Sequence, residues 1–516
     1  MARGLGIVLA GLLGSTTALG QTSETQVLKL KSDLVILDVV ATDDKGKVVE
    51  GLKKEDFSVY ENGVLQTIRT LEAPGAQAAA TPAVAMIDRN GHPTWGEAPL
   101  TVVVLDQLNT PIEEIAYCRD QLFKYLQAQP ALLAEPTSLI VLNDKGIQSA
   151  TPATRDRDAL LKIARKQEVG LPFSLKRGDA DELLAESFAL LRQIALSTRG
   201  DRGRKNVIWV GRGFPGLDPL ALNTRDQESF LRAVRSTVDL LLEARVALYK
   251  IDPRTNLVSS LDSGLDGMGE AGTGMTAPGI ADDPFATTFS FNAFVAQTGG
   301  KNFMYRNDLA REIQEGVSQG SNFYTLSYVP KESREDGSYR KLTVRVNRPE
   351  VSVRTKEGFY AGGGKETEGT KELGFDLRQA ALSGMQYNGV GIHVGEKSWD
   401  SRTGTMRVKV SVDTGSLSFE AKANGAEETT FLVTIVALDE KGKILNFHTT
   451  SPTVEIPAGQ AREIASGHTS VPGTLVVPQK AKGVRVIVRD SSGRIGTAEV
   501  DLGGLRWDLP VVVRRR

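Results

Sequence analysis

Cysteine and histidine are scarce in this chain. Its 516 residues contain one cysteine, Cys118, and four histidines, at positions 92, 393, 448 and 468. A single cysteine excludes an intrachain disulfide, a cysteine-based zinc site and a cysteine-ligated cluster. The histidines form no HxxxH or HxH pair, so the sequence argues against a histidine-rich metalloenzyme. Cys118 falls on the apolar stripe of an expected helix, which predicts a buried and unreactive thiol.

An excess of charge of either sign is also missing. The 62 lysines and arginines and the 63 aspartates and glutamates give a net charge of −1. This balance excludes a strongly basic protein that coats nucleic acid, and it gives no reason to expect an acidic tail. Aromatic residues make up 6%, whereas hydrophobic residues at 40% and charged residues at 24% are typical of globular proteins. We therefore expect no nucleic-acid partner.

Long hydrophobic runs are absent beyond the first residues. No later stretch reaches the ~18 apolar residues of a membrane-spanning helix, so we expect no membrane span. Residues 1–20 combine Arg3, an apolar stretch over 5–13, and the small residues Ala18 and Gly20. This pattern predicts a secretory signal peptide. The expected location is therefore outside the cytoplasm, in a periplasm or the extracellular space.

The length of the chain predicts roughly three domains, at about 150 residues each. Changes of sequence pattern divide it further. The expected parts are a signal peptide (1–20), an N-terminal β module (21–72), a linker (73–98), an α/β domain (99–320), strands proposed to complete the N-terminal module (321–360), a second linker (361–375) and a C-terminal β-sandwich (376–516).

The α/β domain is predicted from an alternation of apolar runs and amphipathic segments. Its expected strands cover 101–106, 138–142, 206–211, 246–251 and 302–305, and its expected helices cover 111–129, 156–166, 181–197, 224–244, 291–298 and 308–318. The strands are apolar throughout, which is typical of strands buried on both faces. We therefore predict a doubly wound, mostly parallel sheet covered by helices.

Alternating apolar and polar residues mark the segments on both sides of the α/β domain. Residues 26–72 include the turn at 43–46 and the hairpin signal Asn62-Gly63. Neither this segment nor 321–360 has enough strands to close a sandwich alone, so we propose that they join into one. Regularly spaced turns after residue 376 predict an immunoglobulin-like or fibronectin-like sandwich of about seven strands.

The most distinctive chemical feature is the run Asp106-Gln107-Leu108-Asn109-Thr110, directly after the first strand of the α/β domain. Ligand sites in open α/β sheets lie at the carboxyl ends of strands. A carboxylate and a hydroxyl in one loop can both face a hard cation, and oxygen ligands suit magnesium or calcium. Asp106 and Thr110 are therefore the candidate metal ligands.

The strings VVVLDQLNT and NVIWVGRGFP resemble the von Willebrand factor A domain family. The metal-ion-dependent adhesion site of that family begins D-x-S-x-S, which Asp106 and Thr110 match at the first and last positions, whereas Leu108 replaces the middle serine. The family's threonine loop matches 178–180, which lacks a threonine. Arg212 stands where the family has a further aspartate. The resemblance therefore implies a degenerate site, at which magnesium or calcium is not expected.

A broader resemblance covers residues 26–361. The strings GRKNVIWVGRGFP, ARVALYKID and YTLSYVP are similar to those of a bacterial secreted group of such proteins. This resemblance implies the fold and export more firmly than any activity.

Without a metal, Asp106 is expected either to cap its loop locally or to pair with Arg212, while Thr110 begins the following helix.

These features together predict a protein–protein interaction or adhesion protein rather than an enzyme. The expected partner-binding residues are Asp106, Asn109, Thr110 and Arg212, and the partner is an unidentified protein. The binding face is expected in the loops at 106–111, 177–181, 211–218 and 252–288. Two alternatives stay open: a structural scaffold protein of the cell envelope, and a hydrolytic or redox enzyme that uses a histidine of a β domain.

Overall fold

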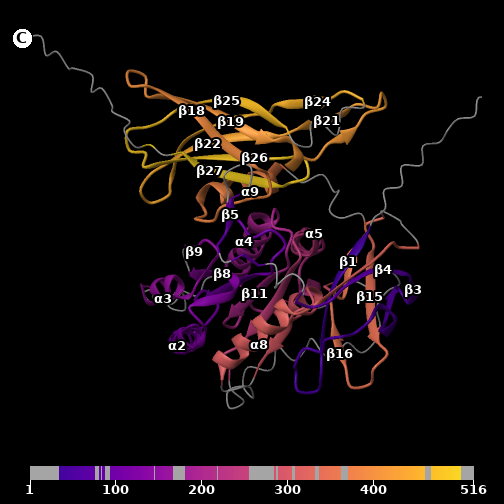
Figure 1. Cartoon of the computed structure of the whole chain (residues 1–516). Helices are drawn as coiled ribbons and strands as arrows, with labels where there is room; N and C mark the ends of the chain where they lie inside the picture. Colours follow the sequence, from indigo (N-terminus) through magenta and orange to yellow (C-terminus); the bar gives the residue numbers. More distant parts are fainter. Residues whose placement is uncertain are drawn as a thin grey trace, which may run out of the picture. The chain divides into compact units, whose positions relative to one another are not determined.

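The computed structural model describes most of the chain. The described residues are 34–75, 81–82, 84–87, 93–143, 146–166, 180–217, 219–254, 284–285, 289–304, 308–331, 336–361, 370–458, 467–500 and 502. They include a parallel-containing sheet with helices and several antiparallel sheets (Figure 1). This confirms the predicted combination of α/β and all-β parts. The predicted signal peptide lies outside the described residues.

Strands from two distant segments pair in the first β module. One antiparallel sheet has the order β16-β1-β14-β4, and another has the order β17-β15-β2-β3. Their bounds are β1 (Val35–Thr42), β2 (Phe57–Glu61), β3 (Val64–Gln66), β4 (Ile68–Glu72), β14 (Tyr324–Tyr328), β15 (Tyr339–Val346), β16 (Ser352–Arg354) and β17 (Gly358–Tyr360). Alternate residues such as Leu37, Val59 and Leu326 meet in one buried cluster. The chain thus leaves this module after β4 and returns to it at β14.

The central sheet has the order β10-β8-β7-β11-β12-β13, with β9 also paired to β8. Its parallel strands are β7 (Leu100–Asp106), β8 (Leu132–Asn143), β11 (Lys205–Val210), β12 (Val246–Ile251) and β13 (Lys301–Phe303), and its antiparallel strands are β9 (Gly146–Ala150) and β10 (Thr154–Asp156). β7 is buried at every position, as its mostly apolar sequence predicts, and β11 is buried at every position although it begins with Lys205 and Asn206. β8 begins earlier than predicted because its first residues pair with β10.

Helices cover both faces of this sheet, as Figure 1 shows for α2, α3 and α8 on one side and α4 and α5 on the other. Their bounds are α2 (Ile112–Ala128), α3 (Arg157–Lys166), α4 (Ala180–Thr198), α5 (Thr224–Glu243), α7 (Phe291–Gln297) and α8 (Leu309–Ser321). Val103 faces the first group and Val104 the second, because neighbouring strand residues point to opposite faces. Cys118 of α2 is buried as predicted, and burial raises the pKa of its thiol. No helix in the described part of the chain is long and apolar enough to cross a bilayer.

The C-terminal module consists of antiparallel sheets. The strand orders are β18-β19-β25, β23-β22-β26-β27 and β20-β21-β24. The bounds are β18 (Ile392–Asp400), β19 (Thr405–Asp413), β20 (Glu420–Ala421), β21 (Glu427–Thr430), β22 (Leu432–Leu438), β23 (Ile444–Thr450), β24 (Thr453–Ile456), β25 (His468–Val476), β26 (Gly483–Arg489) and β27 (Ile495–Val500). Val408 of the first of these sheets shares one apolar core with Ile435 and Val486 of the second, as in a sandwich.

Both predicted linkers contain regular structure. Within 73–98, β5 (Met86–Ile87) pairs with β6 (Pro93–Thr94). The helix α9 (Thr370–Leu382) begins inside the predicted linker 361–375, whose polar composition concealed it. Its buried residues Ala380 and Ala381 pack in a cluster with residues of α4 and the C-terminal strands. Tertiary packing therefore makes this segment a connecting helix between the α/β unit and the last module.

Candidate functional site

The carboxyl ends of β7 and β11 meet where the strand order reverses. After β7 the chain moves to β8 through α2 on one face, and after β11 it moves to β12 through α5 on the opposite face. Open α/β sheets hold their ligands at such switch points, because the loops that leave the two strands diverge there. The loops 106–111 and 211–217 therefore build the candidate site.

Asp106, the last residue of β7, lies at the centre of this site and is 1% exposed. Its Oδ1 accepts hydrogen bonds from the backbone N–H groups of Leu108 (3.1 Å) and Asn109 (2.9 Å). Its Oδ2 accepts from Nε1 of Trp209 (2.9 Å) and from the backbone N–H of Gly213 (3.1 Å). Burial raises the pKa of the Asp106 carboxyl, and these donors partly offset the shift. The carboxylate thus ties the two loops together.

The residues around Asp106 do not fit a metal ion. Both carboxylate oxygens face N–H donors, whose positive ends would repel a cation. The Thr110 hydroxyl accepts a hydrogen bond from the backbone N–H of Arg212 (3.1 Å). A Cβ on Gly211 would lie 2.5 Å from that hydroxyl and 2.7 Å from the Asp106 Cβ, so the loops are in direct contact. Within the described ranges, no three acidic, histidine or cysteine side chains gather to hold a metal.

Arg212 pairs with Glu114 and not with Asp106, which corrects one of the two sequence-based expectations for Asp106. The Nε of Arg212 lies 2.8 Å from Oε2 of Glu114, and Nη2 lies 2.5 Å from Oε1. Asp106 already accepts from five N–H donor groups of the protein, whereas Glu114 is in the first turn of α2 at the edge of the site. The Arg212 and Glu114 side chains are 24% and 20% exposed, so this pair is partly accessible.

The four predicted partner-binding residues do come together, but they differ in exposure. Asp106 and Thr110 are 1% and 3% exposed, so they position the loops and do not face solvent. Asn109 is half-buried, and its Nδ2 donates to Oγ of Ser187 on α4 (3.1 Å) as well as to Asp106. Oδ1 of Asn109 is buried and has no hydrogen-bond partner among the described residues, so access to Asn109 is through the rest of its half-buried side chain. Arg212 and Asn109 are therefore the predicted residues that a partner can reach.

Asp252 is a further carboxylate at this edge of the sheet, and it was missed by the sequence reasoning. It follows β12 and is 0% exposed, with Lys250 at 3.0 Å and Arg254 at 2.7 Å. Burial acts to raise its pKa, but hydrogen bonds from Arg254 and the charge of Lys250 outweigh burial and lower the pKa. An aspartate directly after an apolar strand, as at Asp106, was the signal that would have found it.

Phenylalanines from distant segments support the loop 211–217. Phe214 stacks on Phe289, with ring centroids 5.2 Å apart and an interplanar angle of 7°, and packs edge-on against Phe291 at 4.8 Å. A Cβ on Gly213, where φ is +70°, would lie 2.6 Å from the Phe291 ring. Glycine is therefore needed for this close approach. The aromatic contacts fix the position of the loop that carries Arg212.

The histidines that the structure describes lie away from the candidate site. His393, His448 and His468 are exposed on β18, β23 and β25, and no histidine occurs between 99 and 320. The pattern G-x-S-x-G occurs at 316–320, but it lies within α8 and not at the strand-to-helix turn of a nucleophile elbow. Of the predicted loops, 177–179 and most of 252–288 lie outside the described residues.

Comparison with known proteins does not assign this chain to a family. Neither a protein-family model nor a curated protein sequence matches it. The resemblance to von Willebrand factor A domains stays a prediction from short strings, and the function has to be inferred from the geometry of the site.

Proposed function

We propose that this protein is an exported protein-binding or adhesion protein, whose α/β unit is of the von Willebrand factor A type. It binds its partner through the loops 106–111 and 211–217, without a metal ion. The observation that carries this proposal is the hydrogen-bonding of Asp106, which joins both loops at the switch point and fixes Arg212 at their accessible edge.

A fixed and partly exposed arginine suits protein recognition. Arginine is enriched among the residues that contribute most to protein interfaces, and a preorganised loop loses little entropy on binding. Arg212 is held on one side by Glu114 and on the other by its backbone N–H to Thr110. An acidic group of the partner would add to this arrangement. The N–H donors around Asp106 support a mode of binding that needs no cation.

The test is affinity capture with the full chain and its Arg212→Glu variant. Proteins exported by the source organism are crosslinked to each, and the captured set is quantified by mass spectrometry. The substitution places a carboxylate beside Glu114, so repulsion should move the loop and reduce capture of a specific partner at least tenfold. This corresponds to a loss of about 1.4 kcal/mol or more, which is modest for a buried interface arginine.

Arg402→Glu is the matched control. Arg402 lies in the turn between β18 and β19 with its side chain 87% exposed, and the change of charge is the same. Capture should be unchanged in this variant. If Arg212→Glu keeps its thermal unfolding midpoint and captures the same proteins in the same amounts, the loops are not the binding face. A scaffold role of the protein would then be favoured.

A further inference from the structure

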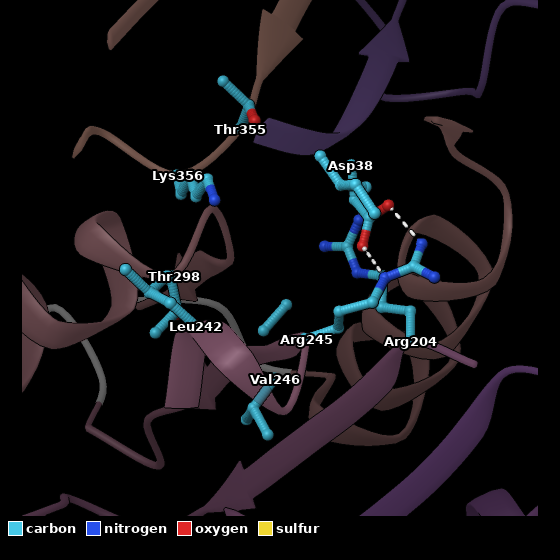
Figure 2. Close-up of a pocket in the computed structure, with 10 residues that line it drawn as sticks. Asp38, Arg204, Leu242, Arg245, Val246, Thr298, Thr355 and Lys356 are labelled. Atoms are coloured by element: carbon cyan, nitrogen blue, oxygen red, sulfur yellow. Dashed lines mark hydrogen bonds and ion pairs between the residues drawn. The ribbon is translucent and has the colours of Figure 1, made fainter. Parts of the chain in front are cut away.

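A recess lies at the amino ends of β11 and β12, on the edge of the sheet opposite to the candidate site. It is a shallow recess that opens to solvent, and the ≈ 330 Å³ of empty space at it includes part of that open solvent. Its polar side chains come from four parts of the chain: Asp38 from β1, Arg204 and Arg245 from the residues before β11 and β12, Thr298 from the end of α7, and Thr355 and Lys356 from the segment between β16 and β17. In Figure 2, Lys356 lies across the recess from Asp38, Arg204 and Arg245.

Asp38 and Arg245 neutralise each other. Nη2 of Arg245 lies 2.6 Å from Oδ1 of Asp38, and Nε lies 3.2 Å from Oδ2. Arg245 also donates from Nη1 to the carbonyl oxygen of Arg202 (3.0 Å) and has a left-handed backbone, with φ at +54°. Its position is therefore fixed by the fold, and this ion pair joins β1 to the start of β12.

Arg204 is not satisfied in the same way. It is 2% exposed and donates from Nη2 to the hydroxyl of Tyr249 at 3.3 Å. Its Nε and Nη1 have no hydrogen-bond partner among the described residues. A buried guanidinium with unused donors is costly, and an anion is the group that relieves this cost.

Lys356 and Thr355 offer further donors from the opposite side. The Lys356 ammonium makes no hydrogen bond or ion pair with another described residue, and it lies 5.6 Å from the centre of the Phe359 ring. The Thr355 hydroxyl is buried and likewise lacks a partner in the described part of the chain. Burial lowers the pKa of Lys356 to about 8, so the side chain is still mostly charged at neutral pH.

The charge of the recess is unbalanced. Among the residues that line it, Asp38 is the one carboxylate beside three cations, Arg204, Arg245 and Lys356. Glu72 and Glu97 also act on Arg245 from outside the lining. Asp239 of α5 also acts on Lys356, but burial raises the pKa of Asp239 to about 7, so it is only partly ionised at neutral pH. Positive side chains on opposite sides of the recess suit an anion. A tetrahedral oxyanion can accept hydrogen bonds from several directions at once, which a planar carboxylate does less well.

We propose that this recess is a binding site for a small tetrahedral oxyanion, with phosphate as the chemical type, held between Arg204 and Lys356. The ligand would join the N-terminal β module to the α/β unit by bonding to residues of both. The site is separate from the partner-binding loops, so it does not depend on the proposed function.

Isothermal titration of the full chain with inorganic phosphate, in a chloride buffer near pH 7, tests this proposal. We expect the wild-type protein to bind phosphate saturably and to bind sulfate as well. Lys356→Met should weaken phosphate binding at least tenfold, and Lys356→Arg should restore most of it. A parallel titration with glycerol 3-phosphate distinguishes free phosphate from a phosphate monoester, because the tighter of the two ligands identifies the source.

Lys341→Met is the control, since Lys341 is an exposed lysine of β15 that does not line the recess. This variant should bind phosphate as the wild type does. Arg204→Met tests the second cation, although it also removes buried contacts. The proposal is overturned if the wild-type protein shows no saturable phosphate binding, if acetate binds as tightly as phosphate, or if Lys356→Met binds phosphate unchanged.

Discussion

Replacing Trp209 by phenylalanine isolates the hydrogen bond that holds the candidate site together. Trp209 is fully buried on β11, and its Nε1 donates to Oδ2 of Asp106 at 2.9 Å. Phenylalanine keeps an aromatic ring beside Phe291 but removes this donor. A hydrogen bond to a charged group contributes about 1.5–3 kcal/mol to stability, so Trp209→Phe should lower the free energy of unfolding by at least that amount near neutral pH.

The pH dependence separates this hydrogen bond from lost packing. Burial already raises the pKa of Asp106 in the folded protein, and the loss of a donor should raise it further, because that hydrogen bond favours the charged carboxylate. The aspartate has a pKa of 3.8 in the unfolded chain and a higher pKa in the folded protein. The unfolded chain therefore loses its proton first as pH rises above 3.8, and the free energy of unfolding decreases. The destabilisation by Trp209→Phe should therefore be limited to the cost of lost packing below pH 3.8 and grow towards neutral pH.

Urea denaturation followed by circular dichroism, at several pH values between 3.5 and 8, measures this difference. The cavity left by the smaller ring costs the same at every pH, so it shifts the whole curve without changing its slope. In an Asp106→Asn background, the Trp209→Phe penalty should not depend on pH. A penalty that is also independent of pH in the wild-type background would refute the reasoning.

Three other substitutions have expected outcomes that denaturation experiments can check. Burial raises the pKa of Glu135 to about 7. Its ionisation therefore lowers the free energy of unfolding as pH rises from about 4.5 to 7. Glu135→Gln, which cannot ionise, should gain up to about 3 kcal/mol in the free energy of unfolding relative to wild type across that range. Asp376→Ala leaves Arg192, its partner at 2.9 Å, without this buried counter-charge, and should lower the free energy of unfolding by about 3–5 kcal/mol. A decrease below about 1 kcal/mol would mean that the pair is solvated. Gly211→Ala places a Cβ 2.5 Å from the Thr110 hydroxyl. It should lower the free energy of unfolding by at least about 1 kcal/mol and weaken partner capture. A variant as stable as wild type would show that the loops can separate.

The secondary structure of the α/β unit was predictable because its signals are local. β12 occupies the predicted residues 246–251, and β7 and β11 differ from the predicted strands by one residue at their ends. Apolar strands and amphipathic helices depend on the spacing of residues along the chain, which a single sequence contains. The helix α9 was not predicted, because its polar composition resembles a linker and its burial depends on contacts with distant segments.

The candidate site was predictable in place but not in its contacts. The sequence put Asp106 after an apolar strand and Arg212 after another, which located the loops that meet at the switch point. It did not indicate that Trp209 would donate to Asp106, since a tryptophan in a buried strand is ordinarily a packing residue. The pairing of Arg212 with Glu114 was also hidden, because 98 residues separate them.

By itself, the sequence determined the class of most segments, the near balance of positive and negative charge, the scarcity of histidine and cysteine, and the position of the polar loops after the strands. The tertiary structure decided which side chains meet. It brought β1 to β14, Trp209 to Asp106, and Arg204 to the same recess as Lys356. The physical reason is that propensity and periodicity act between near neighbours in the chain, whereas ion pairs and buried hydrogen bonds depend on the strand order, which no single segment encodes.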